Sequence, residues 1–189
     1  TEPLEEVPLG EIILTMQMSL DGIVSRPEEW MILSDEILED HVAYYGTVDA
    51  VVFGGNTYEG LEQYWTAAEV SSASPMERAL ARRLNDLPKF IPTCAEIDLT
   101  WRNAKAIRVT GDESFVRAQH GQDLRGKRNP DVAPLSPADL FDALWVLVHP
   151  VIAGEGDRLF DAARGLRRLK LTDSKTYQNG VVGLRYQKA

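Results

Sequence analysis

The sequence predicts a protein of the α/β class, and three observations carry that prediction. Residues 12–19 alternate between two faces with the period of a β-strand. Strand-like and helix-like segments then follow one another through residue 109, in the order strand, helix, strand, helix, helix, strand, strand. Near the C-terminus, Asn179-Gly180 stands between two β-rich runs, which is a strong signal for a hairpin.

Each element before residue 86 has a local reason to form. Ser19-Leu20-Asp21-Gly22 predicts a turn after the first strand, and Ser34 is a typical N-cap for a helix over 34–45. Further along, the pattern predicts a buried strand over 48–53, a helix over 56–64, a small-residue loop over 66–74, and a helix from Pro75 to about Asn85.

The second half of the chain is less regular. Two short strands are expected over 89–93 and 105–109. Residues 110–137 are rich in Gly, Pro, Asp and Arg and show no sustained period, so they predict a long loop, which in a compact domain indicates function, mobility or lost structure. Ser136-Pro137 predicts a helix start, and the chain then closes with expected strands over 144–149, 169–177 and 181–187.

Length and charge limit the possible functions. A chain of 189 residues with 44% hydrophobic content can bury a sizeable core, and we expect a flexible leader over 1–9 and one domain over 10–189. The net charge of −9 argues against nucleic acid and anionic membranes as partners, which favours a small-molecule substrate. No apolar run approaches the roughly 20 residues that span a bilayer, and no signal-peptide pattern is visible. We therefore expect a cytoplasmic protein.

The cysteine and the histidines offer little chemistry by themselves. Cys94 is the only cysteine, so no internal disulfide is possible, and without Cys/His spacing no metal site is expected. His149 ends a predicted strand, and without a visible acid or nucleophile beside it a structural role is favoured. His41 and His120 are expected to be exposed or partly packed.

One segment has the pattern of an anion site. The strand that ends at Phe53 runs into Gly54-Gly55-Asn56-Thr57, a glycine turn and helix start that would aim backbone N–H groups at an anion. Thr57 is equally an ordinary helix-start residue. A second glycine loop that would complete such a site is not visible further along the chain.

Three motifs together resemble those of a known family. They are Ser19-Leu20-Asp21-Gly22-Ile23-Val24, then Gly54-x-x-Thr57-Tyr58-Glu59, then Pro150-Val151-x-x-Gly154-x-Gly156-x-x-Leu159-Phe160. In this order they resemble the dihydrofolate reductase-like superfamily, above all the reductase domain of bacterial riboflavin biosynthesis, whose C-terminal hairpin is similar to residues 174–182. The resemblance covers nearly all of residues 10–188. It implies a three-layer α/β fold with a mostly parallel central sheet, flanking helices and a C-terminal antiparallel hairpin.

The resemblance also implies an activity and a cofactor. It implies an NAD(P)H-dependent reductase that transfers hydride to a small heterocyclic or specialised-metabolite substrate, similar to 5-amino-6-(5-phosphoribosylamino)uracil reductase, and a homodimer that pairs through its C-terminal strands. Gly22 and Ile23 would border the nicotinamide, although a tight turn explains Gly22 equally well. The other implied cofactor-binding residues are Gly54, Gly55, Asn56, Thr57 and Thr93.

Asp35 is the candidate catalytic acid. It lies five residues after Trp30, in the region where dihydrofolate reductases carry the acid that helps protonate the substrate ring, and Glu36 is its neighbour and rival. A carboxylate kept from water beside a tryptophan suits proton donation. An acid in the first turn of a helix also favours the helix dipole, and not all riboflavin-type relatives use this acid.

Two departures from the family pattern bear on the cofactor. Gly55 stands where dihydrofolate reductases have a basic residue that meets the cofactor's ribose phosphate. Residues 131–137, around Val132, lack the glycine pair that cradles the phosphates in relatives. The cofactor is therefore NADPH, NADH or none. The alternative function is a cofactor-free member that binds a ligand, or runs an isomerisation or cyclisation, in the former reductase pocket.

Overall fold

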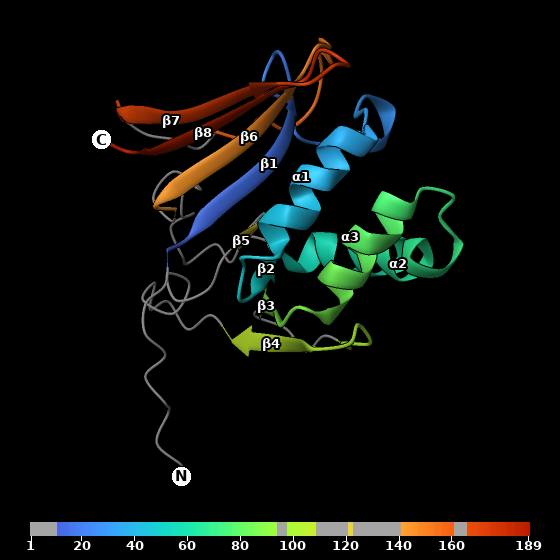
Figure 1. Ribbon diagram of the computed structural model, residues 1–189. Coiled ribbons are helices and arrows are strands. Elements are labelled where there is room, and N and C mark those ends of the chain that lie inside the picture. Colours follow the sequence, from blue (N-terminus) through green and yellow to red (C-terminus); the bar gives the residue numbers. More distant parts are fainter. Residues whose placement is uncertain (1–10, 94–97, 109–120, 123–140, 161–165) are drawn as a thin grey trace.

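The computed structural model describes residues 11–93, 98–108, 121–122, 141–160 and 166–189 (Figure 1). Its first half contains β1 (Ile13–Ser19), a 3-10 turn (Pro27–Glu29), α1 (Asp35–Tyr45), β2 (Val51–Phe53), α2 (Gly55–Ser71) and α3 (Pro75–Asp86). Then follow β3 (Lys89–Thr93), β4 (Ala104–Arg108), β5 (Gly121–Gln122), β6 (Ala143–His149), β7 (Leu169–Thr176) and β8 (Val182–Lys188). In these residues no helix is long and apolar enough to cross a membrane.

The strands form two four-stranded sheets. In the first sheet the order is β1-β6-β8-β7, with β1 and β6 parallel and β8 antiparallel to both of its neighbours. In the second sheet the order is β4-β3-β2-β5, and all pairs are parallel. β5 also lies close to β1, so the two sheets adjoin there. The α/β class and the C-terminal hairpin are confirmed.

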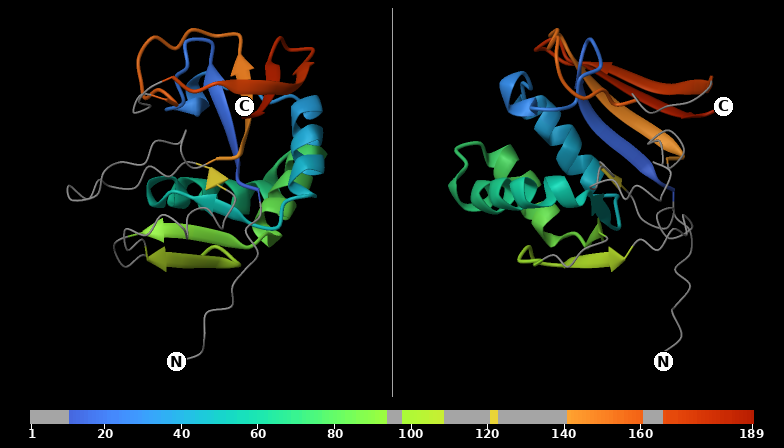
Figure 2. Two further views of the ribbon diagram at one scale, coloured as in Figure 1. Left: turned by 90° about the vertical axis from the view of Figure 1, so that its left-hand side faces the viewer. Right: turned by 180° about the vertical axis from the view of Figure 1, so that it is seen from behind.

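The helices lie where the capping residues predict them. The Ser34 hydroxyl accepts a hydrogen bond from the Ile37 N–H at the start of α1 (3.4 Å), and the Ser74 hydroxyl accepts one from the Glu77 N–H at the start of α3 (3.2 Å). α1 covers one face of the first sheet, and α3 packs against both α1 and α2 (Figures 1 and 2).

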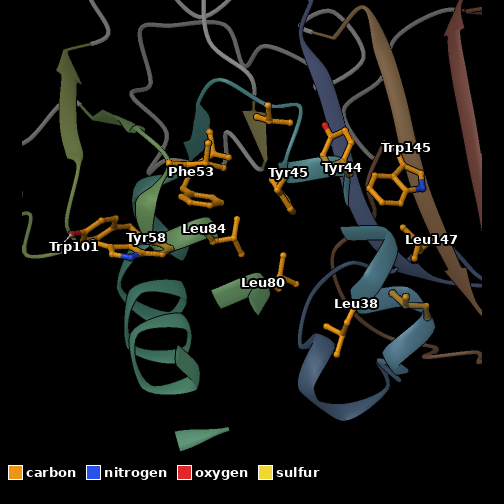
Figure 3. Close-up of a cluster of buried hydrophobic side chains, with 14 of the residues drawn as sticks. Leu38, Tyr44, Tyr45, Phe53, Tyr58, Leu80, Leu84, Trp101, Trp145 and Leu147 are labelled. Atoms are coloured by element: carbon orange, nitrogen blue, oxygen red, sulfur yellow. Dashed lines mark hydrogen bonds between the residues drawn. The ribbon is translucent and has the colours of Figure 1, made fainter. Parts of the chain in front are cut away.

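Two hydrophobic clusters form the core. The larger one joins α1, α2 and α3 to strands of both sheets (Figure 3). It contains Leu38, Tyr44, Tyr45, Phe53, Tyr58, Leu80, Leu84, Trp101, Trp145 and Leu147. The smaller cluster includes Leu14 and Val146, with Met16 and Met18 packed against it. The alternation of residues 12–19 therefore separates two clusters, as a strand buried on both faces requires.

Lys89 joins the end of α3 to the start of β3. Its side chain is completely buried, and its Nζ donates to the carbonyls of Asn85, Leu87 and Arg102 at 2.9, 2.7 and 3.1 Å. The ammonium also lies 4.7 Å from the centre of the Trp101 ring. Burial lowers the pKa of Lys89 to about 8. Because the carbonyls at the end of a helix have no partner within it, this lysine is the side-chain cap of α3.

Two sequence expectations are wrong. The helix expected over 56–64 continues to Ser71, so most of the loop expected over 66–74 is helical; Ala67, Ala68 and Glu69 are good helix formers, and Ala68 is buried. His41, a residue of α1, is buried rather than exposed or partly packed. The mostly parallel pairing expected of the strands is found, in a mixed sheet and an adjoining parallel sheet.

Parts of the remaining expectations lie outside the described residues. These are the leader over 1–9, Cys94, His120, the helix start at Ser136-Pro137 and residues 131–137. Within the long loop expected over 110–137, the two described residues form β5 beside β2.

Candidate functional site

Two loops cross at the carboxyl ends of β1 and β6. Residues 19–25 follow β1 and residues 150–159 follow β6, and we call this pair the crossed loops. The N–H of Leu20 donates to Val151 O (2.8 Å) and the N–H of Val24 donates to Asp157 O (2.8 Å). Ile23 and Arg158 form an antiparallel bridge. These contacts fix the first of the three family motifs against the third.

Asp21 is the centre of the crossed loops. Its carboxylate accepts hydrogen bonds from Ser19 Oγ (2.6 Å) and from the N–H groups of Ala153 (3.0 Å) and Gly154 (2.9 Å). These bonds, that from Ser19 above all, lower the pKa of Asp21 to about 2. Arg158 in turn donates to the backbone carbonyl of Asp21. Asp21 is thus an ionised structural carboxylate and not a proton donor at neutral pH.

Gly22 and Ile23 form the turn that follows β1. Gly22 has a φ of 82°, which favours glycine, and its N–H closes the turn on Ser19 O (2.9 Å). Ile23 is 1% exposed, and its N–H donates to Ser19 Oγ (2.9 Å). The backbone of the turn is therefore fixed by hydrogen bonds, and the Ile23 side chain is enclosed by protein atoms.

The start of α2 is the candidate phosphate site. Gly54 is the N-cap, and among the described side chains none caps this helix end. The Thr57 hydroxyl donates to Gly54 O (3.0 Å), as do the N–H groups of Thr57 and Tyr58. Gly55 and Asn56 begin the helix. The first turn carries no acidic residue, so the positive end of the helix dipole is available to an anion.

Thr93 ends β3 and is paired with Arg108 at the end of β4. Since β2, β3 and β4 are parallel, their carboxyl ends meet at one edge of the second sheet, where α2 begins. Gly54, Gly55, Asn56, Thr57 and Thr93 are therefore brought to the same edge. Gly22 and Ile23 follow the carboxyl end of β1, in the first sheet (Figure 1).

Asp35 begins α1 and is exposed. One of its carboxylate oxygens accepts a hydrogen bond from Ser74 Oγ (3.0 Å) at the start of α3. Trp30 is buried, but its indole N–H donates to Ser25 O (3.0 Å), and its ring meets the edge of His149 with 5.5 Å between centroids. The desolvated setting expected for Asp35 beside Trp30 is therefore not found.

Glu36, the rival acid, holds the C-terminal hairpin. It accepts from the N–H of Gln178 (3.2 Å) and lies 3.5 Å from Lys175 Nζ. Lys175 also pairs with Asp40 (2.7 Å), and Tyr177 donates to the same Asp40 oxygen (2.8 Å). The hydrogen bonds from Lys175 and Tyr177 hold the pKa of Asp40 below its usual value, against the effect of burial. This cluster fastens β7 and β8 to α1.

A chain of polar side chains lies between β1, β6 and α1, and sequence reasoning missed it. Gln17 lies 2.7 Å from His149 Nε2 through its oxygen and 3.3 Å from His41 Nε2 through its nitrogen. His149 is completely buried and His41 is 6% exposed. Gln17 shares the face of β1 that carries Thr15 and Ser19, and this polar run on an inward face was the available signal.

The donor set at the start of α2 fits part of a nicotinamide dinucleotide. Uncapped N–H groups and the absence of an acid suit a pyrophosphate, whereas the first turn also lacks a basic residue that would pair with a 2′-phosphate. The second phosphate loop of the family pattern lies outside the described residues. Among those described, no three His, Cys, Asp or Glu side chains gather to hold a metal ion.

The chain has an α/β fold that is similar to the fold of solved riboflavin-biosynthesis proteins. A protein from Shewanella sp. PV-4 assigned provisionally to riboflavin biosynthesis matches over 95% of this chain and 99% of its own, with a TM-score of 0.64 and 14% identity. The RibD protein of Acinetobacter baumannii matches over 96% of this chain with a TM-score of 0.61 and 13% identity, and this chain spans 58% of it. The resemblance is confirmed as one of fold.

One more solved structure and one curated protein are similar to this chain. The riboflavin biosynthesis reductase Rib7 of Saccharomyces cerevisiae matches over 99% of this chain and 93% of its own, with a TM-score of 0.53 and 15% identity. Among curated proteins, the uncharacterised protein YyaP of Bacillus subtilis strain 168 is 23% identical in an alignment 184 positions long that covers 93% of each chain. No family model matches the chain.

Proposed function

We propose that this protein is a cytoplasmic reductase that uses NADPH or NADH to reduce a small heterocyclic substrate. The observation that carries the proposal is the pair of crossed loops, in which Asp21 fixes the turn at Gly22 and Ile23 against the loop after β6. The fold shared with proteins of riboflavin biosynthesis supports it. The shared fold does not by itself fix an activity, so the site has to be tested directly.

Two parts of this chain would bind the cofactor: the start of α2 and the turn after β1. The start of α2 would hold the cofactor's pyrophosphate, and the turn at Gly22 and Ile23 would border the nicotinamide. When bound, the reduced nicotinamide supplies a hydride to an electron-poor ring or iminium carbon of the substrate. A proton must reach the reduced substrate as well, and Asp35, which is exposed and accepts a hydrogen bond from Ser74, is the candidate residue to deliver it.

Titration with NADPH and NADH, followed through tryptophan fluorescence, tests the proposal first. We expect dissociation constants in the micromolar range for at least one nucleotide. Gly55→Asp places a carboxylate in the first turn of α2 and should weaken binding about tenfold or more, which is about 1.4 kcal/mol. Gly60→Asp is the matched control, because Gly60 lies on the same helix with open space around it.

Two results would contradict the proposal that the protein is a reductase. One is the absence of binding of either nucleotide up to millimolar concentration. The other is an equal loss of nucleotide affinity in Gly55→Asp and Gly60→Asp. A phosphate bound at the start of α2 should be repelled by a carboxylate at position 55 and much less by one five residues further along the helix. The role of Asp35 is tested by Asp35→Asn against Glu36→Gln: a proton donor loses kcat at unchanged KM, and only the first variant should do so.

The cofactor-free alternative is supported by one observation. The first turn of α2 carries no basic residue, so the charge-assisted contact to a 2′-phosphate is missing there. A cofactor-free protein would bind its ligand near the crossed loops and ignore both nucleotides. Mass spectrometry of small molecules released from the purified protein would then identify a ligand, whereas a reductase would release nucleotide or nothing.

We also propose that the protein is a homodimer that pairs along β7. β7 is the outer strand of the first sheet in the described residues, and its Leu171 is 49% exposed. Light scattering should give a mass of about twice 21.1 kDa. Leu171→Glu should give monomers, while Val70→Glu on α2, where the valine is 83% exposed, should leave the dimer intact. A monomeric parent protein would contradict the proposal.

A further inference from the structure

The polar chain under α1 has only one consistent arrangement of hydrogens. The N–H of Ile32 donates to Nδ1 of His149 at 3.3 Å, so this nitrogen carries no hydrogen. A neutral His149 must then carry its hydrogen on Nε2, which donates to Gln17 Oε1 at 2.7 Å. The direction of the first bond is fixed because a backbone amide can only donate.

His41, at the other end of this row of polar side chains, has its hydrogen on the opposite ring nitrogen. Nδ1 of His41 lies 2.8 Å from the carbonyl of Ile37, which can only accept, so His41 carries its hydrogen on Nδ1. Nε2 of His41 therefore accepts from the Gln17 amide nitrogen at 3.3 Å. The Gln17 amide cannot flip without placing two donors face to face at His149. The two histidines are neutral and of opposite tautomer.

The surroundings keep both rings uncharged. His149 is packed among Trp30, Gln17 and the backbone at Ile32, and burial lowers its pKa. His41 is packed against Trp145 and Tyr45, and burial lowers its pKa too. The charged groups that act on His41 are Asp40 on α1, which favours the cation, and Arg185 on β8, which opposes it.

We propose that His149 is a positioning residue: in its neutral form, oriented by Gln17, it holds residues 30–32 against the end of β6. Protonation would place a hydrogen on Nδ1, directly against the N–H of Ile32, so the segment must then leave the ring. Residues 30–32 lead into Ser34 and Asp35, and Trp30 is bonded to the crossed loops through Ser25. The inference goes beyond the proposed function, because it requires no nucleotide.

Nitrogen-15 NMR of the histidine rings tests the arrangement at pH 7.5. We expect His149 as the Nε2–H tautomer and His41 as the Nδ1–H tautomer, with His41→Gln and His149→Gln spectra for assignment. We also expect both to remain neutral below pH 6.5, the usual pKa of histidine. His149 as the Nδ1–H tautomer, or an ordinary titration near 6.5, would overturn the proposal.

A charge placed at the centre of the chain gives a second, independent readout. In Gln17→Glu the carboxylate can accept from Nε2 of both rings, so His41 can take a proton there, and its pKa should rise by about one to three units. Gln63→Glu is the control, because Gln63 is an exposed residue of α2. A His41 titration that is the same in both variants would contradict the arrangement.

Hydrogen exchange at the Ile32 amide tests the positioning itself. His149→Phe removes the acceptor and should speed this exchange at least tenfold at pH 7.5, while the amide of Leu87, bonded to Arg83 O, should be unchanged. In the parent protein the Ile32 amide should shift with the same midpoint as the His149 ring on acidification. An Ile32 amide that ignores both the variant and the ring would refute a positioning role, even if the tautomers are as expected.

Discussion

Gly156→Ala should damage the crossed loops far more than Gly154→Ala. Both glycines have positive φ values, 136° and 80°, so alanine strains the backbone at either position by about 1–3 kcal/mol. A Cβ on Gly156 would also overlap Ser25 Oγ and lie 2.8 Å from Ile23 Cγ2, whereas a Cβ on Gly154 meets nothing within 4 Å. Overpacking of this kind costs about a further 1–3 kcal/mol.

The expected loss of unfolding free energy is therefore about 2–6 kcal/mol for Gly156→Ala and about 1–3 kcal/mol for Gly154→Ala. Urea denaturation followed by circular dichroism measures both, with equal m-values showing that the unfolded states match. Nucleotide titration of the folded Gly156 variant should show weaker binding, because the new methyl group pushes Ile23 from its place. Equal stabilities for the two variants would refute the reasoning, because the overlap of the new Cβ with Ser25 and Ile23 would then cost no free energy.

Three other outcomes follow from the structure. Lys89→Met removes the Nζ donor from the carbonyls of Asn85, Leu87 and Arg102, of which that of Asn85 still accepts from Arg102 Nε, and should lower the unfolding free energy by about 2–4 kcal/mol in urea. Lys105→Met, at an exposed position of β4, should change it by less than about 0.5 kcal/mol. Burial lowers the pKa of His41 and His149, so below about pH 6.5 the unfolded chain binds protons that the folded chain does not. The unfolding free energy should therefore be highest above that pH and fall below it, by up to about 1.4 kcal/mol per pH unit for each ring. An unfolding free energy that stays constant from pH 7.5 to 5.5 would contradict this. Gly55→Arg should strengthen NADPH binding about tenfold over NADH by adding a charge-assisted bond to the 2′-phosphate, and Gly60→Arg should not; equal gains would point to general charge attraction.

The sequence predicted the elements whose signals are local. Ser34 and Ser74 cap the helices that follow them, and Gly180, with a φ of 84°, forms the expected hairpin turn. The C-terminal end of α2 was missed because alanine, serine and threonine are compatible with a loop as well as a helix. What decided the matter is tertiary: Ala68 is buried, and the carbonyl of Trp65 accepts from Asn85 of α3 at 3.1 Å.

Of the candidate site, the sequence predicted only the segments that have a recognisable motif. The turn at Gly22 and the start of α2 at Gly54 are visible as short patterns, and the structure has both. The partners of Asp21 could not be found, because Ala153 and Gly154 donate backbone N–H groups, which leave no trace in residue identity. The link from Gln17 to His149 spans 132 positions, and nothing local requires these two residues to meet.

The pairing of β1 with β6 has a consequence for how the chain is made. β1 ends at Ser19, and its hydrogen-bonded partner strand begins only at Ala143. At a synthesis rate of about 5–20 residues per second, roughly 6–25 seconds pass before the ribosome has added that partner. During this interval the edge groups of β1 have no β6 to bond with, so the first sheet assembles late, and contacts of such long range slow folding. A nascent chain stalled before residue 143 should therefore expose this strand to chaperones, whereas one stalled beyond residue 189 should not.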